Sequence, residues 1–480
     1  MTKHIYGWLI AGLSLASISC KKDLAEINKN PNAAEDPQPD YLLTATQKIT
    51  SDLYWGDANN FNSTLLIIQH WAKIQYTEPD RYIFSNSSFT SLWSTGYAQS
   101  ITNLNTILQM PAEKTNDNYK GVALILRSWI FSLLTDNYGD IPYQEAGDIR
   151  KYLTPKYNTQ KEVYFGLLDE LKTAGASLST GNSPAIAGDI IYSGNIARWK
   201  KFANALRLRI ALRIADREPE KAKQVINEVL NDAGGLIISV DEAARFAYTT
   251  PPQQNPVAAW FDTRDDYRIG KTLVDKLYAL NDPRLPIFAN KPTDATVTTY
   301  VGVPSGLTNS DANNLGFAKT SKPGSYFSTA TAPAVILNYA EVLFGRAEAA
   351  ARGFTTENAE DLYNQAIKAS FNQYAITDLS VINNYTAQAT VKFNAANFKR
   401  SIGEQKWIAL FGQGLEAFAE WRRLDYPQLT AGVAGTLDGK IPVRFIYPGS
   451  EQALNGTSYK NAITNQGPDN LLTKLWFDQY

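Results

Sequence analysis

The chain has 480 residues, 44% of them hydrophobic, and its 46 basic and 47 acidic side chains give a formal net charge of −1. This size and composition allow a substantial core and exclude an intrinsically disordered protein. The balanced charge offers no basic excess, so we expect no nucleic-acid partner. Beyond the N-terminal segment, no apolar run approaches the roughly 18 residues that indicate a membrane-spanning helix.

The first 40 residues are expected to be an export signal followed by a tether. Residues 1–19 start with a short basic segment and continue with about 14 apolar or small residues, too few to span a bilayer and typical of a signal peptide. Cys20, the only cysteine of the chain, follows directly. A cysteine at this boundary indicates lipidation, and residues 20–40 would then tether the protein to a membrane. The alternative is an ordinary cleaved signal with an incidental cysteine.

Helical periodicity dominates the rest of the chain. In chain order, we expect helices over residues 41–54, 62–76, 92–108, 119–135, 160–178, 195–216, 219–232, 271–280, 334–352, 356–374 and 401–423. The helices come in pairs, and residues 340–367 have spacing typical of a tetratricopeptide hairpin, without a regular repeat of about 34 residues. The sequence therefore predicts a mainly α fold over residues 41–480, a single composite domain with a tetratricopeptide-like helical-hairpin scaffold, irregular loop segments and a few short strands.

Two stretches interrupt this helical pattern, residues 234–270 and 290–333. The first contains Pro251-Pro252 and several aromatic residues, and the second is rich in Gly, Ser, Thr, Asn and Pro. Connections of this length are uncommon within a compact domain and are often functional. We expect both to pack beside the helical scaffold, with a short strand within residues 296–303.

The sequence offers little for metal or nucleophile chemistry. His70 is the only histidine after the signal segment, which excludes a Cys–His pair and a multi-histidine zinc site. We expect His70 to be a hydrogen-bonded structural residue. Residues 311–316 are rich in oxygen donors but lack the final acid of a calcium-binding loop, which predicts a polar turn. We therefore expect no metal and no cofactor, and a bound calcium ion is an unsupported alternative.

Acidic residues beside arginines are the candidates for glycoside hydrolysis. They are Asp262, Asp265 and Asp266, with Arg264 and Arg268 interleaved, and Glu416 and Glu420, followed by two arginines. Such neighbours favour ion pairs over the two separately tuned carboxyl groups that hydrolysis requires. We expect no catalytic residues among them.

Aromatic residues in irregular segments are the candidate binding groups. Exposed rings stack on sugar faces or hold peptides, while amides and charged groups supply hydrogen bonds. The candidate ligand-binding residues are Trp55, Asn59, Tyr76, Tyr82, Trp260, Tyr267 and Tyr326. Packing is the simpler role for each residue alone, but for the group we expect some display on the surface.

Blocks of sequence in order along the chain carry a family resemblance. They span residues 121–142, 194–209, 281–285, 339–353, 405–427 and 441–478, and include Tyr138-Gly139-Asp140, Glu420-Trp421-Arg422-Arg423 and Trp476-Phe477-Asp478. Together they resemble the SusD/RagB family of outer-membrane nutrient-binding lipoproteins from Bacteroidetes, in particular its second, SusD-like branch. The family often has paired tryptophans where this chain has Trp476-Phe477, which we interpret as a change within the core.

The resemblance implies four tetratricopeptide-like hairpins and a lid-like role over a SusC-like TonB-dependent transporter. It also implies non-catalytic capture of an oligosaccharide or peptide, with the protein lipid-anchored at the outer membrane and facing the cell surface. No shared motif for ligand contacts maps onto this sequence, so the candidate residues depend on their loop positions alone. Two alternatives stay open: a secreted glycoside hydrolase, and a helical-repeat adaptor that binds protein without a small ligand.

Overall fold

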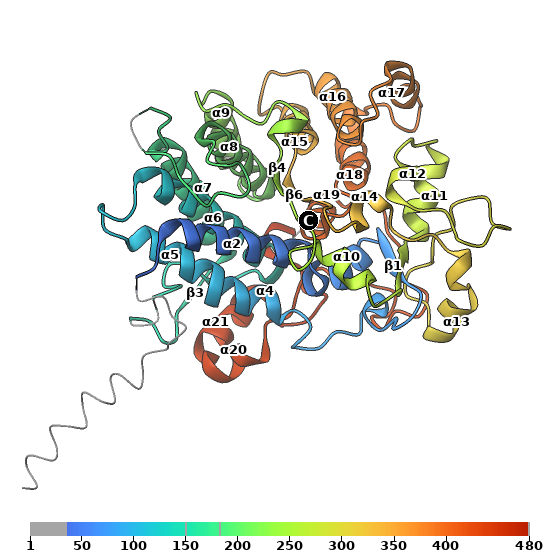
Figure 1. The fold of residues 1–480 in the computed structure, drawn as a ribbon, viewed down its shortest axis with the longest axis horizontal. Helices are drawn as coiled ribbons and strands as arrows, with labels where there is room; N and C mark the ends of the chain where they lie inside the picture. Colours follow the sequence, from blue (N-terminus) through green and yellow to red (C-terminus); the bar gives the residue numbers. More distant parts are fainter. Residues whose placement is uncertain (1–35, 149–150, 182–183, 479–480) are drawn as a thin grey trace, which may run out of the picture.

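The computed structural model describes residues 36–148, 151–181 and 184–478. The predicted signal segment and Cys20 lie outside the described residues. Helices dominate, and the only sheets in the described part of the chain are three antiparallel pairs of short strands, β1–β5, β2–β3 and β4–β6 (Figure 1). The expected mainly α fold with a few short strands is confirmed.

The helices are α2 (Pro39–Trp55), α3 (Leu65–Ile67), α4 (Thr90–Thr95), α5 (Thr102–Gln109), α6 (Asp117–Tyr138), α7 (Gln160–Ser177), α8 (Ile196–Arg213), α9 (Pro219–Leu230), α10 (Pro256–Phe261), α11 (Lys271–Ala279), α12 (Leu285–Phe288), α13 (Asn309–Asn314), α14 (Ser325–Ser328), α15 (Tyr339–Ala351), α16 (Ala359–Asn372), α17 (Leu379–Thr386), α18 (Phe398–Ala409), α19 (Gly414–Leu424), α20 (Gly449–Leu454) and α21 (Gly456–Gln466). The strands are β1 (Trp71–Lys73), β2 (Ile141–Pro142), β3 (Tyr157–Asn158), β4 (Ala244–Phe246), β5 (Tyr267–Ile269) and β6 (Ala334–Leu337). No helix in the described part of the chain is long and apolar enough to cross a membrane.

Four helical hairpins form the scaffold: α6–α7, α8–α9, α15–α16 and α18–α19. Local sequence signals set their ends. The Asn116 side chain accepts a hydrogen bond from the backbone N–H of Tyr119 and so caps α6, which ends where Gly139 takes a φ of 87°. Helix α7 starts with a capping box in which Thr159 and Glu162 satisfy each other's backbone N–H groups.

Four expected elements differ from the structure. The expected helix 334–352 is wrong at its start, because residues 334–337 form strand β6 and α15 begins only at Tyr339. Residues 62–76 are not one helix, because Gln69 has a φ of 60° and strand β1 follows. Residues 401–423 form two helices, α18 and α19, separated by a turn in which Gly412 has a φ of 88°. Residues 296–303 form no strand, and only Val303 makes an isolated bridge, to Gly270.

The two irregular stretches pack beside the hairpins, as expected. Residues 234–270 carry β4, α10 and β5, and residues 290–333 carry α13 and α14 (yellow-green to yellow in Figure 1). Strand β5 pairs with β1, so the first stretch is joined to the chain between α3 and α4. This pairing places the end of α10 next to residues 74–76.

His70 is a buried structural residue, as expected, and it lies between aromatic rings. The expectation that it is hydrogen-bonded is wrong. Its ring centroid lies 4.8 Å from that of Trp407 and 5.4 Å from that of Phe411. Neither ring nitrogen has a hydrogen-bond partner among the described residues. Burial lowers the pKa of His70 to about 3, so the imidazole is neutral in the folded protein near neutral pH.

A buried ion network connects the hairpins. Its members are Asp136 on α6, Arg209 and Arg213 on α8, Glu341 and Glu348 on α15, Lys406 on α18, and Glu416, Glu420 and Arg423 on α19. Arg213 is at the centre: its guanidinium contacts Asp136 at 3.2 Å and Glu416 at 2.9 Å, and also pairs with Glu420. The expectation that Glu416 and Glu420 are held by arginines is confirmed.

The segment after α21 returns to the first hairpin. The backbone N–H of Phe477 donates to Oε1 of Gln160 at 3.2 Å, and the Phe477 ring is buried. The guanidinium carbons of Arg213 and Arg422 lie 5.8 Å and 5.0 Å from its ring centroid. The interpretation of Trp476-Phe477 as a change within the core is confirmed for Phe477.

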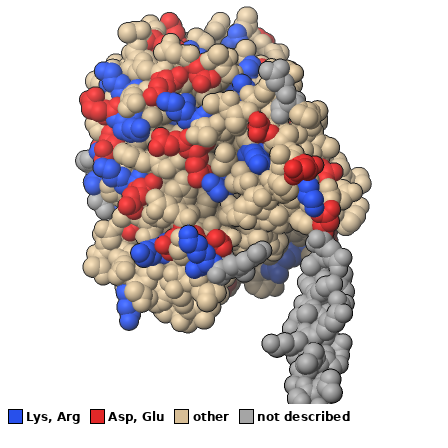
Figure 2. Space-filling model, turned by 90° about the vertical axis from the view of Figure 1, so that its left-hand side faces the viewer, with Lys and Arg blue, Asp and Glu red and all other residues tan. Residues whose placement is uncertain are grey.

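Charged groups of both signs are interspersed on the surface. Figure 2 shows the face at the left of Figure 1, where lysines and arginines alternate with aspartates and glutamates. On that face, the described residues form no broad patch of one sign. This distribution agrees with the balanced composition.

Candidate functional site

Three of the seven candidate residues come together beside β1 and β5. Tyr76 is 55% exposed, Trp260 is partly buried, and Tyr267 lies fully buried beneath them. The ring centroids of Trp260 and Tyr267 are 5.9 Å apart. The expected surface display therefore holds for Tyr76, whereas Trp260 is only partly exposed and Tyr267 belongs to the floor under them.

An arginine lies between the two surface rings. The guanidinium carbon of Arg264 is 4.8 Å from the ring centroid of Tyr76 and 4.9 Å from that of Trp260. We call Tyr76, Arg264 and Trp260 the aromatic–arginine stack. Cation–π contact with both rings fixes the guanidinium. The sequence had indicated Arg264 only as an ion-pair partner, although its place between aromatic residues of an irregular segment was a usable signal.

Local backbone geometry builds this stack. Tyr76 follows β1 with a φ of 53°, a left-handed turn that directs the chain out of the strand. Asn255 caps α10 by accepting a hydrogen bond from the N–H of Val257, which sets the direction of the short helix carrying Trp260. Arg264 lies in the turn between α10 and β5.

Buried polar groups support the stack from below. The Trp260 indole N–H donates to Asp266 at 2.8 Å, and Lys73 Nζ donates to the same carboxylate at 2.9 Å. Burial alone would raise the pKa of Asp266, but these two partners hold it below its ordinary value. Arg264 lies 3.5 Å from Asp266, a looser contact, and its side chain is 39% exposed. The interpretation of these acids as ion-pair partners is confirmed for Asp266.

The stack can contact a ligand in two ways. The guanidinium covers one face of each ring, so a sugar or peptide has access chiefly to the Tyr76 side chain, which is more than half exposed, while Trp260 is only partly exposed. The free N–H groups of Arg264 can donate to hydroxyl, carbonyl or carboxylate oxygens. An exposed ring beside fixed donors is the arrangement that carbohydrate recognition uses.

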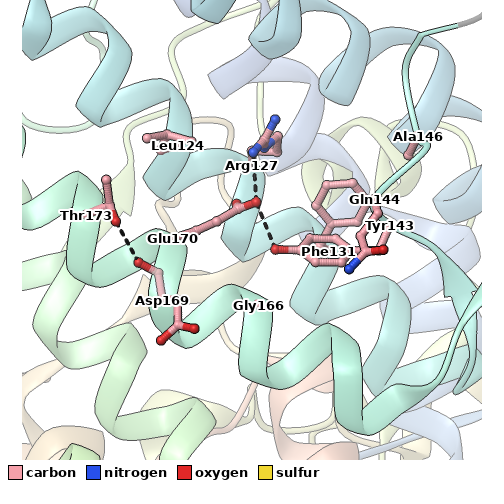
Figure 3. Close-up of a pocket in the computed structure, with 10 residues that line it drawn as sticks. All are labelled: Leu124, Arg127, Phe131, Tyr143, Gln144, Ala146, Gly166, Asp169, Glu170 and Thr173. Carbon is pink, nitrogen blue, oxygen red and sulfur yellow. Dashed lines mark hydrogen bonds and ion pairs between the residues drawn. The ribbon is translucent and has the colours of Figure 1, made fainter. Parts of the chain in front are cut away.

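A hollow between α6 and α7 is a separate candidate (Figure 3). Its volume is about 510 Å³. Glu170 accepts hydrogen bonds at 2.8 Å from both Arg127 and the Tyr143 hydroxyl, while Nε of Arg127 is buried without a partner among the described residues. A Cβ atom at Gly166 would lie 2.5 Å from the Tyr143 ring, which explains the glycine at this position of α7. The hollow contains none of the predicted site residues.

A family model described as "Starch-binding associating with outer membrane" matches residues 31–448. The chain belongs to the SusD-like family. The match covers most of the chain and includes both the hairpins and the irregular stretches that carry the aromatic–arginine stack.

Solved structures share this SusD-like fold over nearly the whole chain. A chitin-binding protein is 26% identical, with a TM-score of 0.82, over 92% of this chain and 100% of that one. A SusD homologue from Bacteroides uniformis is 27% identical, with a TM-score of 0.81 and the same coverage of both chains. A search of the curated proteins found no match.

Two other candidate ligand-binding residues of this SusD-like protein are buried, so the prediction of surface display is wrong for them. Trp55 is 2% exposed: it is the last residue of α2, and after an extended Gly56 residues 57–64 form a π-helix instead of the turn that the sequence suggested. A Cβ atom at Gly412 would lie 3.1 Å from the Trp55 ring. Asn59 is also buried and donates to the backbone oxygen of Leu53 at 3.1 Å.

Tyr82 and Tyr326 lie apart from the stack. Tyr82 is buried beneath the glycine-rich loop near Gly435, so the prediction of surface display is wrong for it too. Burial raises the pKa of its hydroxyl to about 12. Tyr326 is partly buried, with ring centroids 4.9 Å from Phe327 and 5.1 Å from Tyr374. Substitution of Tyr82 would therefore report on packing and not on ligand contact.

The remaining acidic candidates are structural. Asp265 pairs with Arg268 at 2.7 Å, and Asp262 accepts from Gln254 at 2.6 Å. Asp311 accepts from the Thr308 hydroxyl at 2.7 Å in the first turn of α13, so the expected polar turn is largely a short helix. Among the described residues, no group of three or more His, Cys, Asp or Glu side chains is placed to hold a metal ion.

Proposed function

We propose that this SusD-like protein captures a nutrient oligosaccharide at the outer membrane through the aromatic–arginine stack. It delivers the ligand, without hydrolysing it, to a SusC-like TonB-dependent transporter. The exposed stack over a fully paired polar base is the observation that carries this proposal. The family description and the chitin-binding relative support a glycan over a peptide.

The geometry of the stack favours capture over turnover. Arg264 holds the two rings in place before any ligand arrives, so little side-chain freedom is lost on binding. The nearest acids are ion-paired or hydrogen-bonded, and Asp266 is held in its charged form by Lys73 and Trp260. Hydrolysis of a polysaccharide by the purified protein, lost on substitution of one acid pair, would overturn the non-catalytic part of the proposal.

Replacing Tyr76 by alanine is expected to weaken oligosaccharide binding by about three- to tenfold, because an aromatic contact contributes about 0.5–1.5 kcal/mol. Isothermal titration calorimetry with chitin and starch oligosaccharides measures the loss. The thermal midpoint should change little, since the Tyr76 side chain is 55% exposed.

The matched control is Tyr41→Ala on α2, where the tyrosine is 73% exposed and far from the stack in sequence. Its affinity should equal that of the unchanged protein. Equal affinity for Tyr76→Ala and Tyr41→Ala, together with equal affinity for Trp260→Ala, would remove the stack from the proposed site.

Lipid anchoring at Cys20 is part of the same proposal. Replacing Cys20 by alanine is expected to move the protein from the membrane fraction to the soluble fraction of cells that express the full chain, because no acyl chain can then be attached. Immunoblots of the two fractions measure the shift, with Tyr76→Ala as the control that stays with membranes. Equal membrane recovery of Cys20→Ala would contradict the anchor. Co-purification of a SusC-like transporter from the same cells tests the partner.

A further inference from the structure

A second, larger hollow is lined by residues of α11 and α18 and by residues 426–428. Its volume is about 750 Å³, and it shares no lining residue with the aromatic–arginine stack. The lining side chains include Thr272, Asp275 and Lys276 from α11, and Arg400, Glu404 and Trp407 from α18. Within each helix these positions lie three or four residues apart and so share one face.

The groove is lined by two cations, Lys276 and Arg400, and by two acids, Asp275 and Glu404, one of which is neutralised from outside the lining. Lys276 and Arg400 share a single carboxylate, Glu404, at 2.6 Å and 3.2 Å. The other acid, Asp275, is already paired with Lys271 at 2.5 Å. The Arg400 side chain is 56% exposed, and only its Nε contacts Glu404, so its terminal N–H groups face the groove or solvent.

A neighbouring hollow extends the positive surface. It has a volume of about 240 Å³ and shares Asn397, Arg400 and Glu404 with the larger one, so Arg400 stands between the two. Lys392 lines it, and no carboxylate of the described residues lies within ion-pair distance of that lysine. The N-terminus of α18, capped by Asn397, adds the partial positive charge of a helix start.

Aromatic side chains complete the groove. Trp407 is buried in its wall, with its indole N–H donating to the backbone oxygen of Ile68 at 3.0 Å, and Tyr426, which also lines the groove, is partly exposed. We propose that this groove is a second binding site, which takes the carboxylate or sulfate group of an acidic oligosaccharide. Arg400 and Lys276 bind the anionic group, and Tyr426 contacts a sugar ring.

Calorimetric titration with three probes tests the proposal: tetragalacturonate for the carboxylate, a sulfated disaccharide for the sulfate, and maltotetraose as the neutral control. We expect one or both acidic probes to bind and to weaken as salt is added, because exposed charges are screened. Failure of both acidic probes to bind, or equal binding of maltotetraose at the same groove, would overturn the site.

Matched variants locate the binding. Arg400→Gln and Lys276→Gln should each lower the affinity for the acidic probe by at least about tenfold, since charge-assisted hydrogen bonds are lost. The control is Lys172→Gln, because Lys172 shares Glu228 with Arg207 just as Lys276 shares Glu404 with Arg400. Unchanged affinity for Arg400→Gln would overturn the proposal.

The test is independent of the proposed glycan surface. Tyr76→Ala should leave the affinity for the acidic probe unchanged while it weakens binding of the neutral oligosaccharide. Loss of acidic-probe binding in Tyr76→Ala would place the anion at the stack instead and overturn the second site.

Discussion

Replacing Arg213 by methionine is expected to lower the free energy of unfolding by about 3–5 kcal/mol, the loss typical of breaking a buried ion pair from one side. The Arg213 side chain is 1% exposed and contacts Asp136, Glu416 and Glu420 on two other helices. Methionine fills similar space but leaves these carboxylates without their shared cation. Urea unfolding followed by circular dichroism measures the change.

The control for this prediction is an arginine in an exposed pair. Arg400→Met removes a contact to Glu404 from a side chain that is 56% exposed, and should change the unfolding free energy by less than about 1 kcal/mol. A loss below about 1 kcal/mol for Arg213→Met would mean that the remaining cations compensate the carboxylates. The two variants must be compared at one pH, because burial raises the pKa of Asp136.

The second prediction with a large expected effect concerns the stability of the folded protein at acidic pH. Burial lowers the pKa of His70 to about 3, from an ordinary value of 6.5. Between these values the unfolded chain binds a proton that the folded protein cannot, so stability is full above about pH 6.5 and falls by about 1.4 kcal/mol per pH unit toward pH 3. Replacing His70 by leucine should remove this contribution.

The measurement is the slope of stability against pH, from urea unfolding at about pH 7, 5.5 and 4.5. The packing cost of leucine shifts all three points of the variant together, so only the difference in slope reports on the proton. The unchanged protein should lose stability more steeply than His70→Leu. Parallel slopes would show that the buried imidazole is protonated in the folded state or reached by water.

Most of the scaffold could be predicted from sequence because strong local signals coincide with the helix ends. Helix α6 has an apolar face, an asparagine cap and a terminal glycine, and its predicted and observed positions agree closely. The failures occur where one residue reverses the backbone. Gln69 and Gly412 both take positive φ values, and nothing in the apolar pattern around them marks the interruption. The two glycines of Gly412-Gln413-Gly414 were the available signal for the turn between α18 and α19.

The site was predictable only in part, because exposure depends on tertiary contacts. Tyr76, Trp260 and Tyr267 were selected for their irregular segments, and pairing of β1 with β5 brings them together. Trp55 has equally turn-like neighbours, yet the π-helix and the close approach of Gly412 enclose its ring. The groove of Lys276 and Arg400 could not be predicted, since α11 and α18 are more than a hundred residues apart in the chain.

The contact between Phe477 and the first hairpin bears on the order in which the protein folds. Its partner Gln160 lies 317 residues earlier in the chain, so the core around α7 and Arg213 stays open until the segment after α21 is available. Contacts of such long sequence separation slow folding. A chain still emerging from the ribosome therefore lacks the piece that seals its first hairpin.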